Sequence, residues 1–356
     1  MFRAALLASV SALIGGGAAA QTAPQVSEVV VTAAPYAVSM DSATTSVEIL
    51  KRDELDLAPT SGLGDVLNGV PGVRSTFFGP GASRPVIRGL AGPRVLVLTN
   101  GVGMIDASAL SPDHQVASDP QEASRIEVLR GPSALAYGGS AIGGIVNIID
   151  GRIADAKVQG VEGRVLGSVS SVDDGQSTSA AVKAGLGSFV VTLDGLHREA
   201  EDYQVPVPAE SRRQLEADGE AYPGPVDSTV ENTSVELDAF GAGVSYVGTR
   251  GFVGVAMKRT DTRYGVPGHE HHHEHEHEGE EEEHEEEAHE EGVAIELEQT
   301  RYDLRGGLDV GLGPFERLRF SGGYADYEHV ELEGGEAATR FLSEGWEGRF
   351  ELVQPE

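Results

Sequence analysis

From about residue 158 onward, apolar and polar residues alternate along the chain with a period of two. The alternation is clearest at residues 161–170, 189–194, 302–310 and 346–352. A period of two places the apolar side chains of a strand on one face of a sheet. Each stretch runs about 10 residues, the length of a tilted strand that crosses a membrane. A soluble β-sandwich shows the same alternation, usually in shorter strands, so the pattern alone favours neither structure.

The composition limits the fold class, the kind of partner and the kind of metal ligand that we expect. Glycine occurs 47 times and aromatic residues make up only 6% of the chain, which favours β-structure with many turns over a helical bundle. The 26 basic residues against 57 acidic ones give a formal net charge of -31, which repels phosphate backbones and argues against a nucleic-acid partner. Because the chain has no cysteine, any metal must be bound through nitrogen and oxygen.

The first 20 residues have the features of a secretory signal peptide. Arg3 precedes an apolar run, and the small residues Ala18-Ala19-Ala20 form a cleavage site before Gln21. No run of 18 or more apolar residues follows. We therefore expect an exported protein that is either soluble or a β-barrel, since only helices and closed barrels satisfy their backbones in lipid.

Residues 47 to 150 are expected to form a compact domain of mixed α and β character. Residues 63–69 predict a short helix that ends at Gly69 and Pro71. Asn100-Gly101 is a two-residue hairpin signal. Short β-prone runs predict strands at 47–50, 85–88, 94–98, 124–129 and 145–149.

Two long polar inserts interrupt the alternating strands, at Glu199–Asn232 and Gly265–Gly292. The other connections between strands are short. Long loops on one side and short turns on the other are typical of outer-membrane barrels, so the inserts favour the membrane barrel over the sandwich.

Five motifs occur in order between residues 27 and 149. They are residues 27–33 (SEVVVTA), 65–73 (DVLNGVPGV), 85–90 (PVIRGL), 125–132 (RIEVLRGP) and 137–149 (YGGSAIGGIVNII). These motifs and their order resemble the TonB-dependent outer-membrane receptors. The first is similar to the TonB box of that family, and the other four are similar to motifs of its N-terminal plug domain.

The resemblance implies an α+β plug domain at residues 47–150, followed by an antiparallel transmembrane β-barrel from residue 151. It places residues 21–46 in the periplasm as a linker and the chain in the outer membrane of a Gram-negative bacterium. Substrate would bind between the plug and the extracellular loops. The TonB box residues Glu28, Val29, Val30, Val31 and Thr32 would then pair as a strand with TonB, for which an extended β-branched segment is suited.

The length of the chain departs from the family pattern. After residue 150 only 206 positions remain, with about seven or eight strand candidates, whereas plugged outer-membrane transporters resemble 22-stranded barrels. We therefore expect the N-terminal part of a receptor, with the barrel incomplete in this chain.

Residues 269–291 are the stretch most informative about function. Of these 23 positions, eight are His and 13 are Glu. Imidazole with carboxylate suits Zn²⁺, with Ni²⁺ and Cu²⁺ as alternatives, whereas a pure Glu run would be a solvated acidic loop. The interleaved histidines therefore predict metal binding by an extracellular loop at 265–292. The candidate ligands are His269, His271, His272, His273, His275, His277, His284 and His289.

A second candidate metal site lies in the expected plug, at Ser111-Pro112-Asp113-His114. Read alone, a Pro-Asp pair is more often a simple turn. The chain also resembles the zinc-uptake receptors of the family, which combine a His-rich loop with an Asp-His pair in a plug loop, and this implies that Asp113 and His114 are metal ligands. His329, Glu331 and Glu333 are further candidates from the barrel, although their spacing does not require it.

The favoured function is therefore uptake of zinc or a related divalent metal, with TonB, membrane lipid and the metal as partners. Two alternatives remain open: a haem or metal-siderophore receptor, and a surface protein that buffers metal without transport. The inserts contain only two aromatic residues, Tyr203 and Tyr222, which disfavours the first alternative. The sequence contains no catalytic motif, so we do not expect an enzyme.

Overall fold

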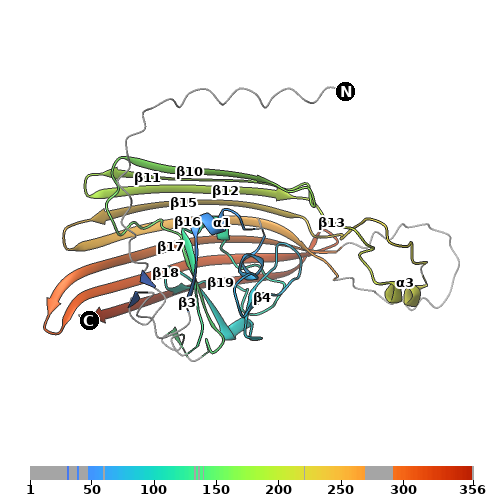
Figure 1. The fold of residues 1–356 in the computed structure, drawn as a ribbon, viewed down its shortest axis with the longest axis horizontal. Helices are drawn as coiled ribbons and strands as arrows, with labels where there is room; N and C mark the ends of the chain where they lie inside the picture. The colour runs from blue at the N-terminus through green and yellow to red at the C-terminus, as the bar shows by residue number, and fades with distance from the viewer. Residues whose placement is uncertain are drawn as a thin grey trace, which may run out of the picture.

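The computed structural model describes residues 30–31, 38–39, 47–58, 61–131, 134, 137–138, 140–219, 221–268 and 292–354. The expected signal peptide, three TonB-box residues (Glu28, Val29 and Thr32) and all eight histidines of residues 269–291 lie outside the described residues. The chain forms a small α+β domain that lies against one face of a large, curved antiparallel sheet (Figure 1).

The α+β domain, which we call the plug, is built on a mixed five-stranded sheet. Its strand order is β3-β8-β9-β6-β7, in which β6 and β9 are parallel and the other pairs antiparallel. A short β4–β5 ladder, two helices and two 3₁₀ turns complete it. The bounds are β3 Val47–Lys51, α1 Arg52–Leu55, α2 Leu63–Leu67, β4 Val73–Ser75, β5 Pro85–Ile87, η1 Gly92–Arg94, β6 Val95–Thr99, β7 Val102–Gly103, η2 Pro120–Glu122, β8 Arg125–Leu129 and β9 Gly144–Ile149.

The plug elements follow from local sequence signals. All six residues of β9 are buried, as expected for an apolar run at the centre of a sheet. Asn100 and Gly101 have φ angles of 53° and 82°, so the predicted Asn-Gly pair forms a left-handed two-residue turn between β6 and β7. The predicted strands at 47–50, 85–88, 94–98, 124–129 and 145–149 are confirmed to within a residue, whereas β4 was missed.

The large sheet has eight strands in sequence order, all antiparallel to their neighbours. Several strands are much longer than the ten residues expected from the sequence, and β17 has 20 residues. The bounds are β10 Val161–Val169, β11 Gln176–Leu186, β12 Phe189–Ala200, β15 Val235–Val247, β16 Gly251–Val266, β17 Val293–Leu312, β18 Phe315–Glu333 and β19 Glu336–Val353.

The two faces of this sheet have opposite chemistry. The convex face exposes large apolar side chains, such as Val165, Trp346 and Phe350 at 78%, 82% and 78% exposure. The concave face buries polar side chains against the plug, among them Arg198 and Lys258. Apolar outside and polar inside is the pattern of a membrane β-barrel, so the sheet is the wall of such a barrel, unclosed in this chain. Among the described residues, no helix is long and apolar enough to cross a bilayer.

The two ends of the wall also differ. Short turns join β11 to β12, β15 to β16 and β17 to β18 at one end, which we call the turn end. At the other, the loop end, long connections follow β12 and β16. The first of these contains β13 (Gln204–Val205), α3 (Arg212–Asp218) and β14 (Ser228–Thr229), and it projects to the right in Figure 1. The second carries the His/Glu-rich residues.

Candidate metal centre

His114 lies in the plug segment between β7 and η2, which we call the 106–117 loop. The carboxylate of Asp106 closes this loop: it accepts hydrogen bonds from the backbone N–H of Ser108 at 3.1 Å and of Ala117 at 3.0 Å. Within the loop, the N–H of His114 faces the carbonyl of Ser111 at 3.5 Å, the turn expected of Ser-Pro-Asp-His.

The wall strand β18 brings two further ligand candidates to His114. His329 and Glu331 are two residues apart, so both point to the concave face. The Nε2 atom of His114 lies 3.3 Å from Oε1 of Glu331, and Nε2 of His329 lies 3.7 Å from the same oxygen. One ligand atom from each of the three residues lies within 4.8 Å of the others. A plug loop and a wall strand therefore share one cluster, which we call the plug–wall cluster.

The remaining ring nitrogens of both histidines have polar neighbours. Nδ1 of His114 lies 3.3 Å from the carbonyl oxygen of Ala107, and Nδ1 of His329 lies 3.0 Å from the hydroxyl of Tyr327. A carbonyl only accepts hydrogen bonds, so in the neutral ring Nδ1 of His114 carries the proton and Nε2 presents a lone pair. Such orientation of an imidazole by its second nitrogen is typical of metal ligands.

A lone pair on His114 Nε2 that faces a carboxylate is repulsive unless a cation lies between them. Either a proton or a metal ion supplies the positive charge. In a tetrahedral zinc site with bonds of about 2.1 Å, neighbouring ligand atoms are roughly 3.4 Å apart. The separations of 3.3 and 3.7 Å from Glu331 are close to that spacing, so the cluster has the chemistry and the size to hold a divalent transition metal.

The predicted residues differ in where the structure places them. His114, His329 and Glu331 come together, whereas Asp113 and Glu333 are not members of the cluster. The carboxylate of Asp113 accepts a hydrogen bond from the hydroxyl of Ser111. The side chains of His329 and His114 are 1% and 12% exposed and that of Glu331 is 25% exposed, so solvent reaches the cluster through Glu331.

The cluster lies near the loop end of the wall. His329 pairs with Leu297 on β17, four residues along the strand from Val293, and Val293 pairs with Val266. The His/Glu-rich residues leave the sheet between Val266 and Val293. At 3.3 Å per residue, the cluster is about 13 Å below the point where that segment begins.

A buried charge network fixes the plug to the wall. Glu122 of η2 binds Lys258 of β16 at 2.5 Å and Arg152 at 2.7 Å, and Asp119 binds Arg198 of β12 at 2.8 Å. Burial alone would raise the pKa of Glu122, but Lys258 and Arg152 outweigh it and hold that pKa below its ordinary value. Glu122 is therefore an ionised partner of Lys258 and Arg152, and no local sequence pattern predicts this pairing.

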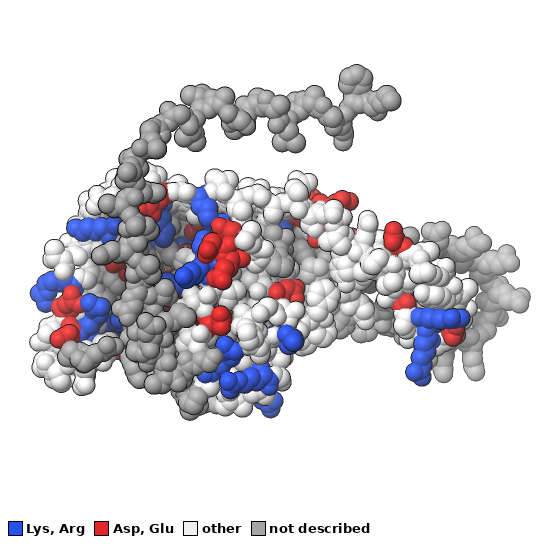
Figure 2. All heavy atoms as spheres, in the orientation of Figure 1, with Lys and Arg blue, Asp and Glu red and all other residues white. Residues whose placement is uncertain are grey.

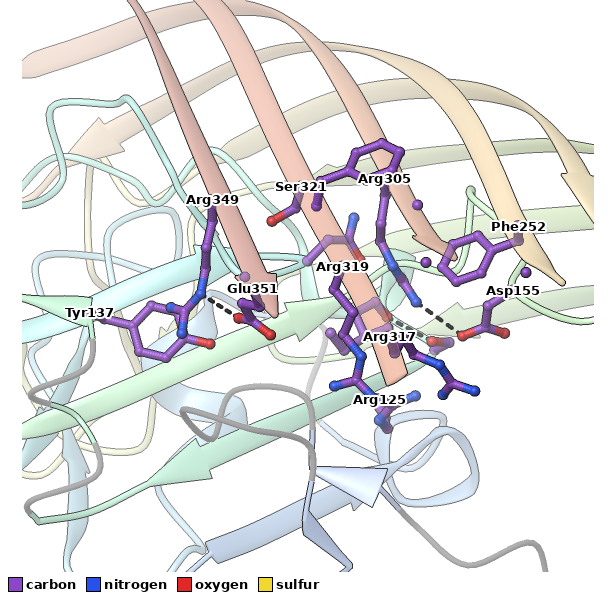
Figure 3. A pocket seen from close by; sticks show the side chains of 18 of the residues that line it. Arg125, Tyr137, Asp155, Phe252, Arg305, Arg317, Arg319, Ser321, Arg349 and Glu351 are labelled. Carbon is purple, nitrogen blue, oxygen red and sulfur yellow. Dashed lines mark hydrogen bonds and ion pairs between the residues drawn. The ribbon is translucent and has the colours of Figure 1, made fainter. Parts of the chain in front are cut away.

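A cavity lies between the plug and the turn end of the wall, and the net positive charge of its lining is the opposite of what a metal ion needs. It has a volume of about 710 Å³ and is lined by six basic and three acidic side chains, several of them shown in Figure 3. Arg349 stacks over the ring of Tyr137 at 3.9 Å, and Arg305 binds Asp155 at 3.0 Å. Basic side chains interleaved with acidic ones are visible at this end in Figure 2. We call it the arginine cavity.

The amino-acid sequence of this chain is similar to those of known proteins. Residues 39–145 match the family model of the TonB-dependent receptor plug domain. The iron-regulated outer membrane virulence protein of Vibrio cholerae is 34% identical over 152 residues, which are 40% of this chain and 23% of that protein. The chain contains the plug domain of the TonB-dependent receptors. It spans about a quarter of the length of such curated relatives.

Solved structures of TonB-dependent receptors share the fold. The FrpB iron transporter of Neisseria meningitidis superposes with a TM-score of 0.62 over 87% of this chain and 47% of that chain, at 14% identity. The copper transporter OprC gives a TM-score of 0.59 over 80% of this chain and 38% of that chain, at 16% identity. The expected plug and antiparallel barrel wall and the outer-membrane location are confirmed.

Proposed function

We propose that this TonB-dependent receptor takes up a divalent metal, zinc first among the candidates, and binds it at the plug–wall cluster. His114 of the plug and His329 and Glu331 of the wall would be ligands. The observation that carries the proposal is the convergence of these three side chains, of which His114 and Glu331 are 217 residues apart in sequence.

The donor set supports zinc in particular. Two imidazoles and one carboxylate form a familiar set of three protein ligands for zinc, with a fourth position open for water or substrate. Ni²⁺ and Cu²⁺ accept the same donors. Asp113 is adjacent to His114, and we propose that its carboxylate supplies the fourth ligand by turning away from Ser111.

The position of the cluster supports a route for the metal. We propose that the His/Glu-rich residues 269–291 capture metal at the cell surface and pass it to the cluster about 13 Å below. Their many overlapping ligands favour weak binding of several ions, because each bound ion must order a chain without apolar groups to bury.

Energy coupling would come through TonB. Val30 and Val31 of the proposed TonB box form strand β1, which pairs with β2 (Val38–Ser39) of the same chain. A ladder of two residues is short, so exchange of β2 for a strand of TonB requires the loss of few hydrogen bonds. TonB is therefore proposed as the partner of residues 28–32.

The proposal is tested by zinc titration of the purified receptor after residues 269–291 are replaced by a short Gly-Ser linker. We expect the intact protein to bind several zinc ions and the loop-deleted protein to keep one, the tightest. Combined Asp113→Ala and His114→Ala should remove that site, whereas His197→Ala, which changes an exposed histidine of β12, should not. If the loop-deleted protein binds no zinc, the proposed function is wrong.

A further inference from the structure

We propose that Tyr264 of β16 is a positioning residue for the plug–wall cluster: its hydroxyl fixes the backbone on both sides of His114 and so strengthens metal binding. The inference rests on the proposed function, because it concerns the same cluster. It adds a residue that does not contact the metal.

The hydroxyl of Tyr264 makes two hydrogen bonds to the 106–117 loop. It accepts one from the backbone N–H of Gln115 at 2.9 Å and donates one to the backbone carbonyl of Asp113 at 3.1 Å. These two groups flank His114. A single wall side chain therefore holds the loop immediately before and immediately after the plug ligand.

The ring of Tyr264 has no freedom to move away from this position. The residue is 1% exposed and packs in an apolar cluster with Ala82, Val235, Val266 and Ile295. A Cβ atom added at Gly81 would lie 2.5 to 2.8 Å from three atoms of the Tyr264 side chain, so the plug backbone approaches the ring closely. The hydroxyl is thus placed by packing on both the plug and the wall.

Two restraints hold His114 between them. Asp106 closes the base of the 106–117 loop through Ser108 and Ala117, and Tyr264 holds its far side. A loop without these bonds would sample many conformations, and metal binding would have to select one of them. Preorganisation by Tyr264 should therefore appear as tighter binding rather than as a new ligand.

The test is zinc titration of the loop-deleted receptor carrying Tyr264→Phe, which keeps the ring and removes only the hydroxyl. Loss of two hydrogen bonds to the loop should weaken zinc binding about tenfold. Tyr302→Phe is the matched control, because Tyr302 lies on the exposed face of β17 and should leave the affinity unchanged.

A double-mutant cycle separates positioning from general loss of structure. If Tyr264 acts through His114, Tyr264→Phe should have almost no effect on the residual affinity of the His114→Ala protein. An equal loss in both backgrounds, or no loss in the wild-type background, overturns the inference while zinc binding by the parent protein leaves the proposed function intact. Absence of zinc binding by the parent protein overturns both.

Discussion

The site at the loop end of the plug–wall interface and the cavity at its turn end differ in size and in the charge of the side chains that line them. The turn end holds a cavity of about 710 Å³ with twice as many basic as acidic side chains. At the loop end, two imidazoles and a carboxylate each place one ligand atom within 4.8 Å of the others. The comparison teaches that volume does not identify a cation site: the lone pairs available and the sign of the surrounding charge decide.

The largest difference between the two ends should appear in metal affinity. His329→Ala removes a proposed ligand and should weaken zinc binding by the loop-deleted receptor about a hundredfold or more, because loss of an outer-shell partner alone costs about 10- to 100-fold. Arg319→Ala, in the arginine cavity, should leave the zinc affinity unchanged. Isothermal titration of both variants measures the contrast, and equal effects would mean that the two ends are not distinct.

The buried charge network around Glu122 should affect stability more than zinc affinity. Glu122→Gln removes the buried carboxylate that Lys258 and Arg152 share, although Arg152 keeps Asp150 and Asp194, and should destabilise the docked plug by about 3 to 5 kcal/mol. Denaturant unfolding, monitored through the protease resistance of the plug, measures this change in the free energy of unfolding. Glu316→Gln, at an exposed position, is the control. A change below about 1 kcal/mol would show that the network does not hold the plug.

The same network fixes the direction of a pH effect. The pKa of Glu122 is lower in the folded protein than its ordinary value of 4.5. Its ionised form is therefore stabilising above pH 4.5, and that contribution is lost as the pH falls through the lower folded pKa. The Glu122→Gln protein should lack this acid-dependent loss, whereas the Glu316→Gln protein should retain it.

Much of the fold could be predicted from the sequence because its signals are local. The Asn100-Gly101 turn, the apolar run of β9 and the alternation along the wall strands each depend on neighbouring residues. Strand β4 was missed because it has only three residues, one of them the charged Arg74. Strand lengths were underestimated because glycine pairs such as Gly322-Gly323 interrupt the alternation within continuous strands.

The site could be predicted only in part. The adjacent pair Asp113 and His114 is visible as a motif, but the meeting of His114 with His329 and Glu331 depends on how the plug docks against β18, which no local pattern specifies. The same holds for Tyr264, whose role arises from two backbone hydrogen bonds across the interface. The sequence predicts most of the secondary structure, but it does not predict how the plug docks against the wall.

The central claim is that one metal ion bridges the plug and the wall at His114, His329 and Glu331. Anomalous diffraction at the zinc absorption edge from crystals of the loop-deleted receptor tests it directly. We expect a single strong peak about 2.0 to 2.2 Å from Nε2 of both histidines and from a carboxylate oxygen of Glu331. A peak that contacts only plug residues or only wall residues, or none at this position while zinc is bound, would contradict the account.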